Sequence, residues 1–308
     1  MQHDYKGFPN RDRAHVIAAL FPQNAEVITH RGDDLLMPVF SAERGISLTP
    51  STSAPRIVTP TSEAVYRDLG TTWDIAKYAE PRQPVSLGLV GEQIRATFGR
   101  PLPTWAQHVL DMPIKFPGTD VRLPRELESI APALRHIVQI DQQLVPDWHR
   151  YYAYLSVHQA EIKAGERMRE NPYHVDGFQG PRWTKKHPVN RSYLLSDAVP
   201  TAFYPMSFPI DHLDLERDDV YAEFAHRIES APDAPVWRAR DFELTLMDAY
   251  CVHRSDVATQ PVFRTWIRVS WETRIFDRLG NSHNPLFDYS WEMVNRDTDP
   301  RIRPRATA

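Results

Sequence analysis

The stretch RTWIRVSW, residues 264 to 271, points most directly to a fold. It is rich in β-branched and aromatic residues, which favour an extended strand. Because successive side chains of a strand point to opposite faces, Arg264, Trp266, Arg268 and Ser270 share one face. The segment therefore predicts a strand that presents two guanidinium groups, an indole and a hydroxyl on the same side.

Several short segments of similar character precede this strand, separated by Pro, Asp or Gly. They are WHRYYAYLSVHQAEI (148–162), RSYLLSD (191–197), TAFYP (201–205), VWRA (236–239), FELTLMD (242–248) and AYCVHRS (249–255). A short strand ending at His174 brings the expected total to about eight. One clear helix, at 218–230, interrupts them. Strands without repeated helical crossovers favour a mainly β fold of the jelly-roll kind over a Rossmann or TIM architecture.

The remaining sequence predicts helices and loops around this core. Residues 12–21 have helical spacing, and residues 123–145 have apolar side chains three and four apart, which predicts an amphipathic helix interrupted near Pro132. We therefore expect residues 1–308 to form a single domain. Within it, we expect residues 146–275 to form the jelly-roll core, residues 1–145 a helical and loop region, and residues 276–308 a tail that closes over the core; any catalytic site is expected in the jelly roll.

Composition narrows the class of partner. Hydrophobic residues make up 42% and charged residues 25%, which are values typical of a globular protein. A net charge of -4 gives no reason to expect binding to nucleic acid or to an anionic membrane, so a small-molecule partner is expected. The single Cys251 excludes an intramolecular disulfide and fits the cytoplasm, and no stretch reaches membrane length. The oligomeric state is left open.

A candidate metal site lies in NPYHVDGFQG, residues 171–180. On a strand, His174 and Asp176 point to the same face, and His253 can supply a third ligand from a distant strand. Two imidazoles and one carboxylate on one face of an ion leave three positions open, as in non-haem Fe(II) oxygenases. The competing interpretation is a loop histidine followed by an aspartate that caps a turn.

A second H-x-D copy occurs at His212 to Asp214. Only 38 residues lie between Asp214 and His253, and a helix takes up about a third of them. From Asp176 the interval is 76 residues, enough for the strands that must intervene. The first copy is therefore the better candidate.

The order H-x-D, distal His, then Arg resembles the Fe(II)/2-oxoglutarate-dependent dioxygenase superfamily, whose fold is the double-stranded β-helix. The resemblance covers roughly residues 150–275 and implies that His174, Asp176 and His253 bind Fe(II). It also implies that 2-oxoglutarate and O2 are cosubstrates. Arg264, 11 residues after His253, best matches the position that binds the far carboxylate, with Arg268 as the second candidate and Ser270 as an additional donor. An exposed strand face with salt bridges is the alternative for both arginines.

The resemblance implies hydroxylation of a C–H bond in a small metabolite or natural-product intermediate, because related halogenases have a small residue where this chain has Asp176. Arg182 and Trp183 lie in a basic loop that either covers the mouth, favouring an anionic substrate, or is simply solvated. His158 is a further candidate pocket residue. Two alternatives remain: a cupin-like metalloenzyme that does not use 2-oxoglutarate, and a non-enzymatic β-sandwich binding module.

Overall fold

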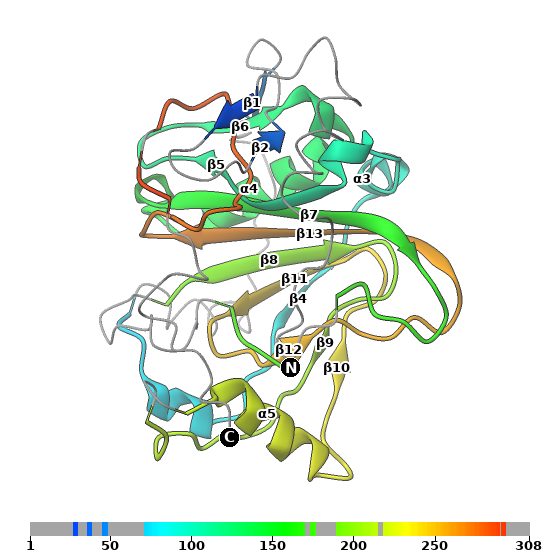
Figure 1. The fold of residues 1–308 in the computed structure, drawn as a ribbon, viewed down its shortest axis with the longest axis vertical. Helices are drawn as coiled ribbons and strands as arrows, with labels where there is room; N and C mark the ends of the chain where they lie inside the picture. Colours follow the sequence, from blue (N-terminus) through cyan, green and yellow to red (C-terminus); the bar gives the residue numbers. More distant parts are fainter. Residues whose placement is uncertain are drawn as a thin grey trace.

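The computed structural model describes residues 27–29, 36–38, 45–48, 71–169, 173–176, 189–214, 218–289 and 291–293. Its core is a pair of antiparallel sheets that face each other (Figure 1). The larger sheet has six strands in the order β4-β11-β8-β13-β7-β5, and the smaller has three in the order β10-β9-β12. This arrangement confirms the mainly β jelly-roll class.

The strands of the two facing sheets have the following bounds: β4 Val85–Leu89, β5 His108–Lys115, β7 Tyr152–Ile162, β8 Arg191–Ser196, β9 Ala202–Phe203, β10 Trp237–Arg238, β11 Glu243–Asp248, β12 His253–Arg254 and β13 Val262–Glu272. Two separate two-stranded ribbons pair β1 (Val27–Thr29) with β2 (Leu36–Pro38) and β3 (Gly45–Leu48) with β6 (Val121–Pro124).

Strand β13, which contains the stretch RTWIRVSW, pairs along its whole length with β7, from Val262 opposite Ile162 to Glu272 opposite Tyr152. On its other edge it pairs with β8. Its side chains alternate as the sequence predicts: Ile267, Val269 and Trp271 belong to the main hydrophobic core. The side chains on the opposite face of β13, which include Arg264 and Arg268, point into the space between the two sheets.

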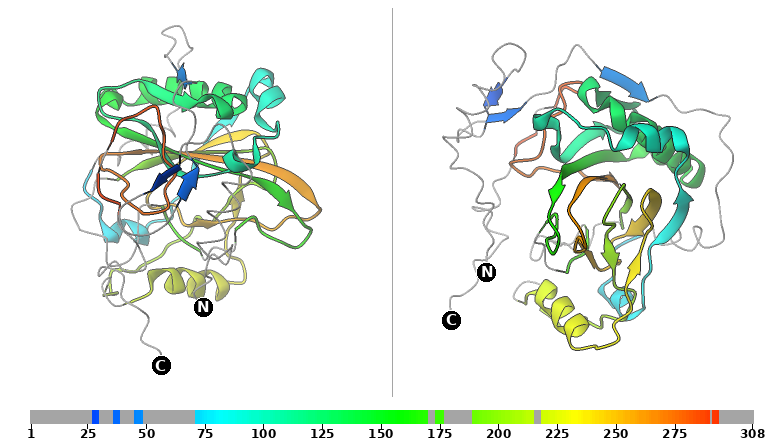
Figure 2. Two further views of the ribbon diagram at one scale, coloured as in Figure 1. Left: turned by 45° about the horizontal axis from the view of Figure 1, so that its top comes forward. Right: turned by 90° about the vertical axis from the view of Figure 1, so that its right-hand side faces the viewer.

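Helices α3 (Glu92–Phe98) and α4 (Ala131–Leu144) cover the outer face of the large sheet, and α5 (Val220–Glu229) lies at the opposite end of the molecule (Figure 2). The predicted helix at 123–145 is divided into a 3-10 turn, Arg125–Ile130, and α4. Pro132 lies in the first turn of α4, where its missing N–H leaves no hydrogen bond unmade. The predicted interruption near Pro132 is therefore present, and Pro132 lies at the start of the α-helical part. Short 3-10 turns also occur at Ile75–Ala79, Thr104–Ala106 and Trp148–Arg150.

Three parts of the fold differ from the pattern expected of the sequence. Strands β4 and β5 join the large sheet from the region expected to hold helices and loops. The expected strand ending at His174 is a single bridge to His253, and the expected strand at 249–255 is reduced to β12 because Asp248 caps a turn by accepting from the Tyr250 N–H. The expected helix at 12–21 lies outside the described residues. No helix in the described ranges is both long and apolar enough to cross a membrane.

A buried ion pair fastens α4 to the large sheet. Arg191 on β8 donates from Nε and Nη2 to the two carboxylate oxygens of Asp141 on α4, at 2.6 and 2.7 Å. The Tyr193 hydroxyl donates to the same carboxylate at 2.9 Å, and the Arg191 guanidinium lies 4.4 Å from the Tyr151 ring centroid. Both charges are removed from water, so each depends on the other for compensation.

We expect Asp141→Ala to lower the free energy of unfolding by about 3–5 kcal/mol, because it leaves the Arg191 charge buried without its partner. Glu128→Ala is the matched control, since it removes an ion pair with Arg125 whose side chains are 63% and 67% exposed. The control should change stability by less than about 1 kcal/mol. Urea denaturation of both variants measures the difference, and equal losses would contradict this account.

Candidate metal centre

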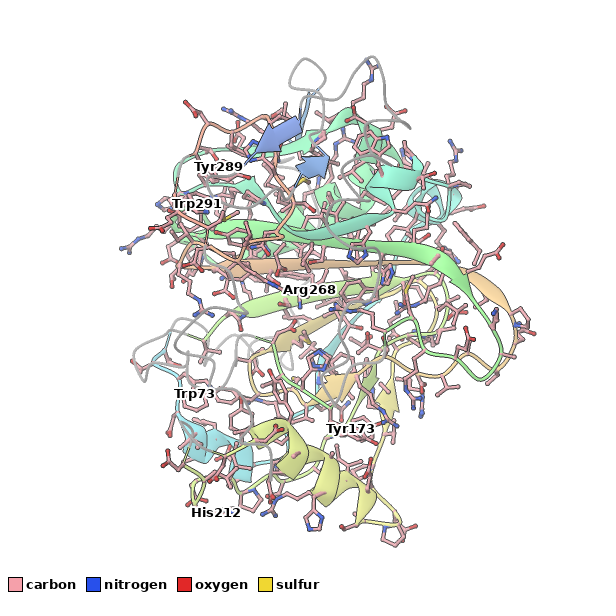
Figure 3. All side chains as sticks on the ribbon, viewed as in Figure 1. Trp73, Tyr173, His212, Arg268, Tyr289 and Trp291 are labelled. Atoms are coloured by element: carbon pink, nitrogen blue, oxygen red, sulfur yellow. The ribbon has the colours of Figure 1, made fainter. Side chains whose placement is uncertain are left out.

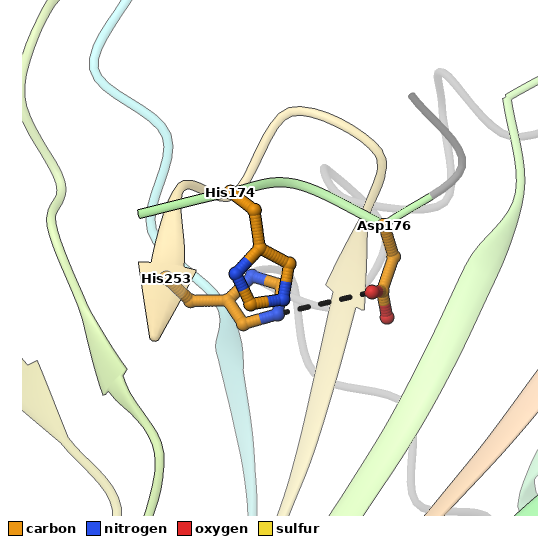
Figure 4. A group of neighbouring side chains, drawn as sticks. All are labelled: His174, Asp176 and His253. Carbon is orange, nitrogen blue, oxygen red and sulfur yellow. Dashed lines mark ion pairs between the residues drawn. The ribbon is translucent and has the colours of Figure 1, made fainter. Parts of the chain in front are cut away.

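His174 and His253 are brought together by their backbones. The His174 N–H donates to the His253 carbonyl at 3.0 Å, and the His253 N–H donates to the His174 carbonyl at 2.8 Å. Because β12 also pairs with β9, this bridge adds His174 to the edge of the small sheet. The two ring centroids are 4.4 Å apart, and one donor atom from each of His174, Asp176 and His253 lies within 4.8 Å of the others (Figure 4).

The His253 ring is oriented by a backbone carbonyl. Its Nδ1 lies 2.9 Å from the Cys251 carbonyl oxygen, which can only accept, so Nδ1 carries the proton and Nε2 carries the lone pair. That Nε2 is 3.9 Å from Asp176 Oδ1. Burial lowers the pKa of His253, which keeps the imidazole neutral and able to coordinate a metal.

The carboxylate of Asp176 is also suited to bind a cation. Burial alone would raise its pKa, but the adjacent Arg268 guanidinium lowers it to about 2, so the group is ionised at neutral pH. Its Oδ2 is buried and has no hydrogen-bond partner in the described structure. A buried carboxylate oxygen of this kind is costly unless something binds it. The residues present therefore fit a divalent ion held by two histidines and one aspartate.

The two imidazoles open onto a small pocket between the sheets. Its lining residues are His158, Arg169, His174, Thr201, His253, Ser255, Arg264, Trp266 and Arg268. Three of them are arginines, so the pocket favours an anionic ligand. The strand alternation deduced for RTWIRVSW places Arg264, Trp266 and Arg268 in this lining together.

Arg264 is almost fully buried, with 3% of its surface exposed. Its Nε donates to the Ala198 carbonyl at 2.9 Å, and no carboxylate lies within ion-pair distance of it in the described ranges. Burial lowers the pKa of this guanidinium to about 10, against the raising effect of Asp197 and Asp241. Arg264 is therefore a buried, undercompensated cation facing the pocket.

Arg268 is in a different situation, near the middle of the molecule (Figure 3). Its Nη1 donates to Asp176 Oδ1 at 2.7 Å, and its Nη2 donates to Asp111 Oδ1 at 2.7 Å. Although burial opposes the charged form, these two carboxylates raise the pKa of Arg268 above its ordinary value. Two carboxylates thus already compensate its charge.

The other candidate residues are distributed as follows. His158 lines the pocket, and burial lowers its pKa to about 3, so its imidazole is neutral. The Ser270 hydroxyl lies 2.9 Å from Ser192 Oγ and outside the pocket lining. Arg182 and Trp183 lie outside the described residues. The second H-x-D copy is on the surface, with His212 and Asp214 exposed.

Several residues of the site are not singled out by the sequence pattern, among them Arg169, Asp111 and Ser156. Arg169 follows the long strand β7 and lines the pocket. Asp111 and Ser156 contact Arg268 from β5 and β7. For Ser156 the sequence does hold a signal: it lies two residues before His158 on β7, so strand alternation places both side chains on the same interior face.

The far end of β13 holds another buried acid, Glu272, which is 3% exposed. Burial raises its pKa to about 7, despite the lowering effect of Arg274 and of the hydrogen bond from Asn190. The folded protein therefore binds this proton more tightly than the unfolded chain does. Protonated Glu272 therefore contributes its full share to the free energy of unfolding at low pH. This contribution is lost as the pH rises from about 4.5 to about 7.

We expect Glu272→Gln to remove this pH dependence in the metal-free protein. Between pH 5 and pH 8 the free energy of unfolding of the variant should rise relative to wild type, by up to about 3 kcal/mol. Gln keeps the oxygen that accepts from Asn190 Nδ2 and never ionises. Thermal unfolding of both proteins across this range tests the prediction, and parallel curves would contradict it.

No family model and no curated protein matches this chain. Among solved structures, it is similar to AviO1 from Streptomyces viridochromogenes Tue57, with 13% identity, a TM-score of 0.39 and coverage of 71% of this chain and 96% of that chain. HygX from Streptomyces hygroscopicus with iron bound has 9% identity and a TM-score of 0.36, covering 78% and 98%. EctD from S. alaskensis with bound Fe has 14% identity and a TM-score of 0.38, covering 76% and 83%.

Proposed function

We propose that this protein is an Fe(II)- and 2-oxoglutarate-dependent oxygenase that hydroxylates a C–H bond of a small molecule. The observation that carries the proposal is the convergence of His174, Asp176 and His253 within 4.8 Å, beside a pocket that also contains Arg264. A two-histidine, one-carboxylate set with open positions is the donor set of non-haem Fe(II) oxygenases. A buried arginine in the same pocket supplies a partner for an anionic cosubstrate.

The metal ligands in this proposal are His174, Asp176 and His253. Cys251 acts through its backbone by holding the His253 tautomer whose Nε2 faces the site. Asp176 contributes a negative charge that stays ionised because of Arg268. Bound there, ferrous iron supplies the activation of O2 that is coupled to oxidative decarboxylation of 2-oxoglutarate to succinate.

For the far carboxylate of 2-oxoglutarate, Arg264 is a better partner than Arg268. Its charge has no carboxylate within ion-pair distance in the described structure, whereas Arg268 already contacts two. A planar guanidinium binds a carboxylate through two parallel hydrogen bonds, which would offset the burial of Arg264. The neutral His158 imidazole and the hydroxyls of Thr201 and Ser255 provide additional polar groups in the pocket lining.

The substrate side of the proposal is limited to a small molecule. Trp266 forms one wall of the pocket and packs against the cluster of Leu194, Phe203, Met247 and Cys251, so this wall is apolar. Hydroxylation is the outcome we propose because Asp176 occupies the carboxylate position of the triad. Ser270, Arg182 and Trp183 remain predictions as contacts for cosubstrate or substrate.

We expect Asp176→Ala to abolish substrate-coupled formation of succinate, because it removes the only carboxylate of the donor set. The matched control is Asp214→Ala, which removes the aspartate of the exposed second H-x-D copy and should leave turnover unchanged. Succinate and metal content are measured for purified wild type and both variants. Undiminished turnover in Asp176→Ala would remove Asp176 from the triad, and wild type that holds iron without converting 2-oxoglutarate would favour the cupin-like alternative.

Replacing Arg264 tests the cosubstrate. We expect Arg264→Gln to weaken 2-oxoglutarate binding by about 2 kcal/mol, or roughly thirtyfold in Kd, because a charge-assisted contact is lost. Arg264→Lys keeps the charge without the planar fork and should give an intermediate Kd. Anaerobic calorimetry with Mn(II)-loaded protein measures both values. An unchanged Kd in folded Arg264→Gln would exclude this residue as the carboxylate partner.

A further inference from the structure

Of the three candidate ligands, Asp176 has the least backbone support. His174 and His253 hold each other by two backbone hydrogen bonds, at 3.0 and 2.8 Å. Asp176 lies outside every strand, and in the described structure its carboxylate is held by one hydrogen bond, from Arg268 Nη1 at 2.7 Å. The position of this ligand therefore depends on where Arg268 is held.

Arg268 is held from its other side by a second carboxylate. Its Nη2 donates to Asp111 Oδ1 at 2.7 Å. The Ser156 hydroxyl donates to that same oxygen at 3.0 Å and accepts from the Asp111 N–H at 3.1 Å. Ser156 lies directly opposite Arg268 in the pairing of β7 with β13. A connected series of polar contacts thus runs from Asp176 across β13 and β7 to β5.

The backbone of β5 is distorted at the residue that completes this series. The pairing of β5 with β7 shifts register between Val109 and Met112, and Asp111 between them has a φ of 44°. A non-glycine residue in this left-handed region costs about 1–3 kcal/mol, although aspartate and asparagine tolerate it better than most residues. Register shifts of this kind redirect a side chain, often beside an active site. Here the shift turns the Asp111 carboxylate toward Arg268.

We propose that Asp111 and Arg268 are positioning residues that fix the carboxylate ligand of the metal centre. Arg268 sets the orientation of the Asp176 carboxylate, and Asp111 both anchors Arg268 and balances its charge. Without Asp111, Arg268 would be left with Asp176 as its one carboxylate partner, would compete with a metal ion for it, and would add an unbalanced positive charge beside the ion. The inference rests on the proposed function, since it requires that Asp176 bind a metal.

The decisive variant is Asp111→Asn, because Asp111 is not one of the three candidate metal ligands and does not line the pocket. Asparagine keeps the tolerance for positive φ, so the change removes the charge while retaining the backbone conformation. We expect Co(II) and Mn(II) to bind about tenfold to a hundredfold more weakly than to wild type, measured by calorimetry without 2-oxoglutarate. The visible spectrum of the Co(II) complex should change as well, since it reports the ligand geometry.

Two further variants complete the design. Arg268→Gln should weaken metal binding to a similar extent, and adding Asp111→Asn to it should have no additional effect, because the two residues act as one unit. Glu223→Gln is the matched control: it removes a 2.6 Å ion pair with Arg227 on α5 and should leave metal affinity unchanged. If Asp111→Asn proves poorly folded by thermal unfolding, Ser156→Ala replaces it, with an expected loss of about two- to threefold.

The outcomes separate this inference from the proposed function. Normal metal affinity in folded Asp111→Asn and Arg268→Gln, with a wild type that binds metal and forms succinate, would overturn the positioning role alone. A metal-saturated Arg268→Gln that keeps wild-type metal affinity but loses affinity for 2-oxoglutarate would make Arg268 a cosubstrate ligand instead. A wild type that binds no divalent metal would overturn both proposals.

Discussion

The candidate site depends on two backbone hydrogen bonds that pair His174 with His253. These residues are far apart in the sequence, yet the bridge brings their rings to 4.4 Å between centroids. Backbone pairing fixes the direction of each side chain, so the convergence of the imidazoles follows from the small sheet and not from any affinity between the rings. The Cys251 carbonyl then selects the His253 tautomer, and the result is a set of atoms that could hold a metal ion.

The alternation of side chains along a paired strand also gives the large sheet two chemically different faces. On β13, Ile267, Val269 and Trp271 pack in the core that includes α3 and α4, while the alternate residues face the small sheet. A polar barrel interior is costly unless each buried charge has a partner. Arg268 meets two carboxylates, and Arg191, on the outer face, meets Asp141. Among the described residues, Arg264 contacts a carbonyl and a thioether and no carboxylate within ion-pair distance, so its charge favours an incoming anion.

The paired strands of the large sheet also carry the charged side chains of the candidate site. Strand β13 is paired on both edges, and it carries Arg264 and Arg268 into the interior at fixed spacing. Asp176 lacks such pairing and depends on Arg268 for its position. Strand β5 supplies the last support through Asp111, at the cost of a strained backbone conformation. The paired strands thus support the position of Asp176, the candidate ligand that lies outside every described strand.

The sequence alone was sufficient for the features that depend on local periodicity. Alternation in RTWIRVSW predicted which residues share the interior face. The H-x-D spacing with a distal histidine predicted the three side chains that converge as the candidate metal centre, and distinguished them from the second copy at His212. The amphipathic spacing of α4 and α5 predicted two of the helices. These features can be predicted because strands and helices repeat every two and every 3.6 residues, and the order of apolar and polar side chains in the sequence has the same periods.

Only the tertiary structure decided which charges meet. The strands β4 and β5 have too little alternation to be recognised, and the different charge environments of Arg264 and Arg268 depend on a register shift in β5 that brings Asp111 to Arg268. An ion pair between strands is fixed by register and by the direction of single side chains, and one inserted residue reverses that direction. Contacts of this kind have no local pattern in the sequence, because the partners meet only after the sheet has formed.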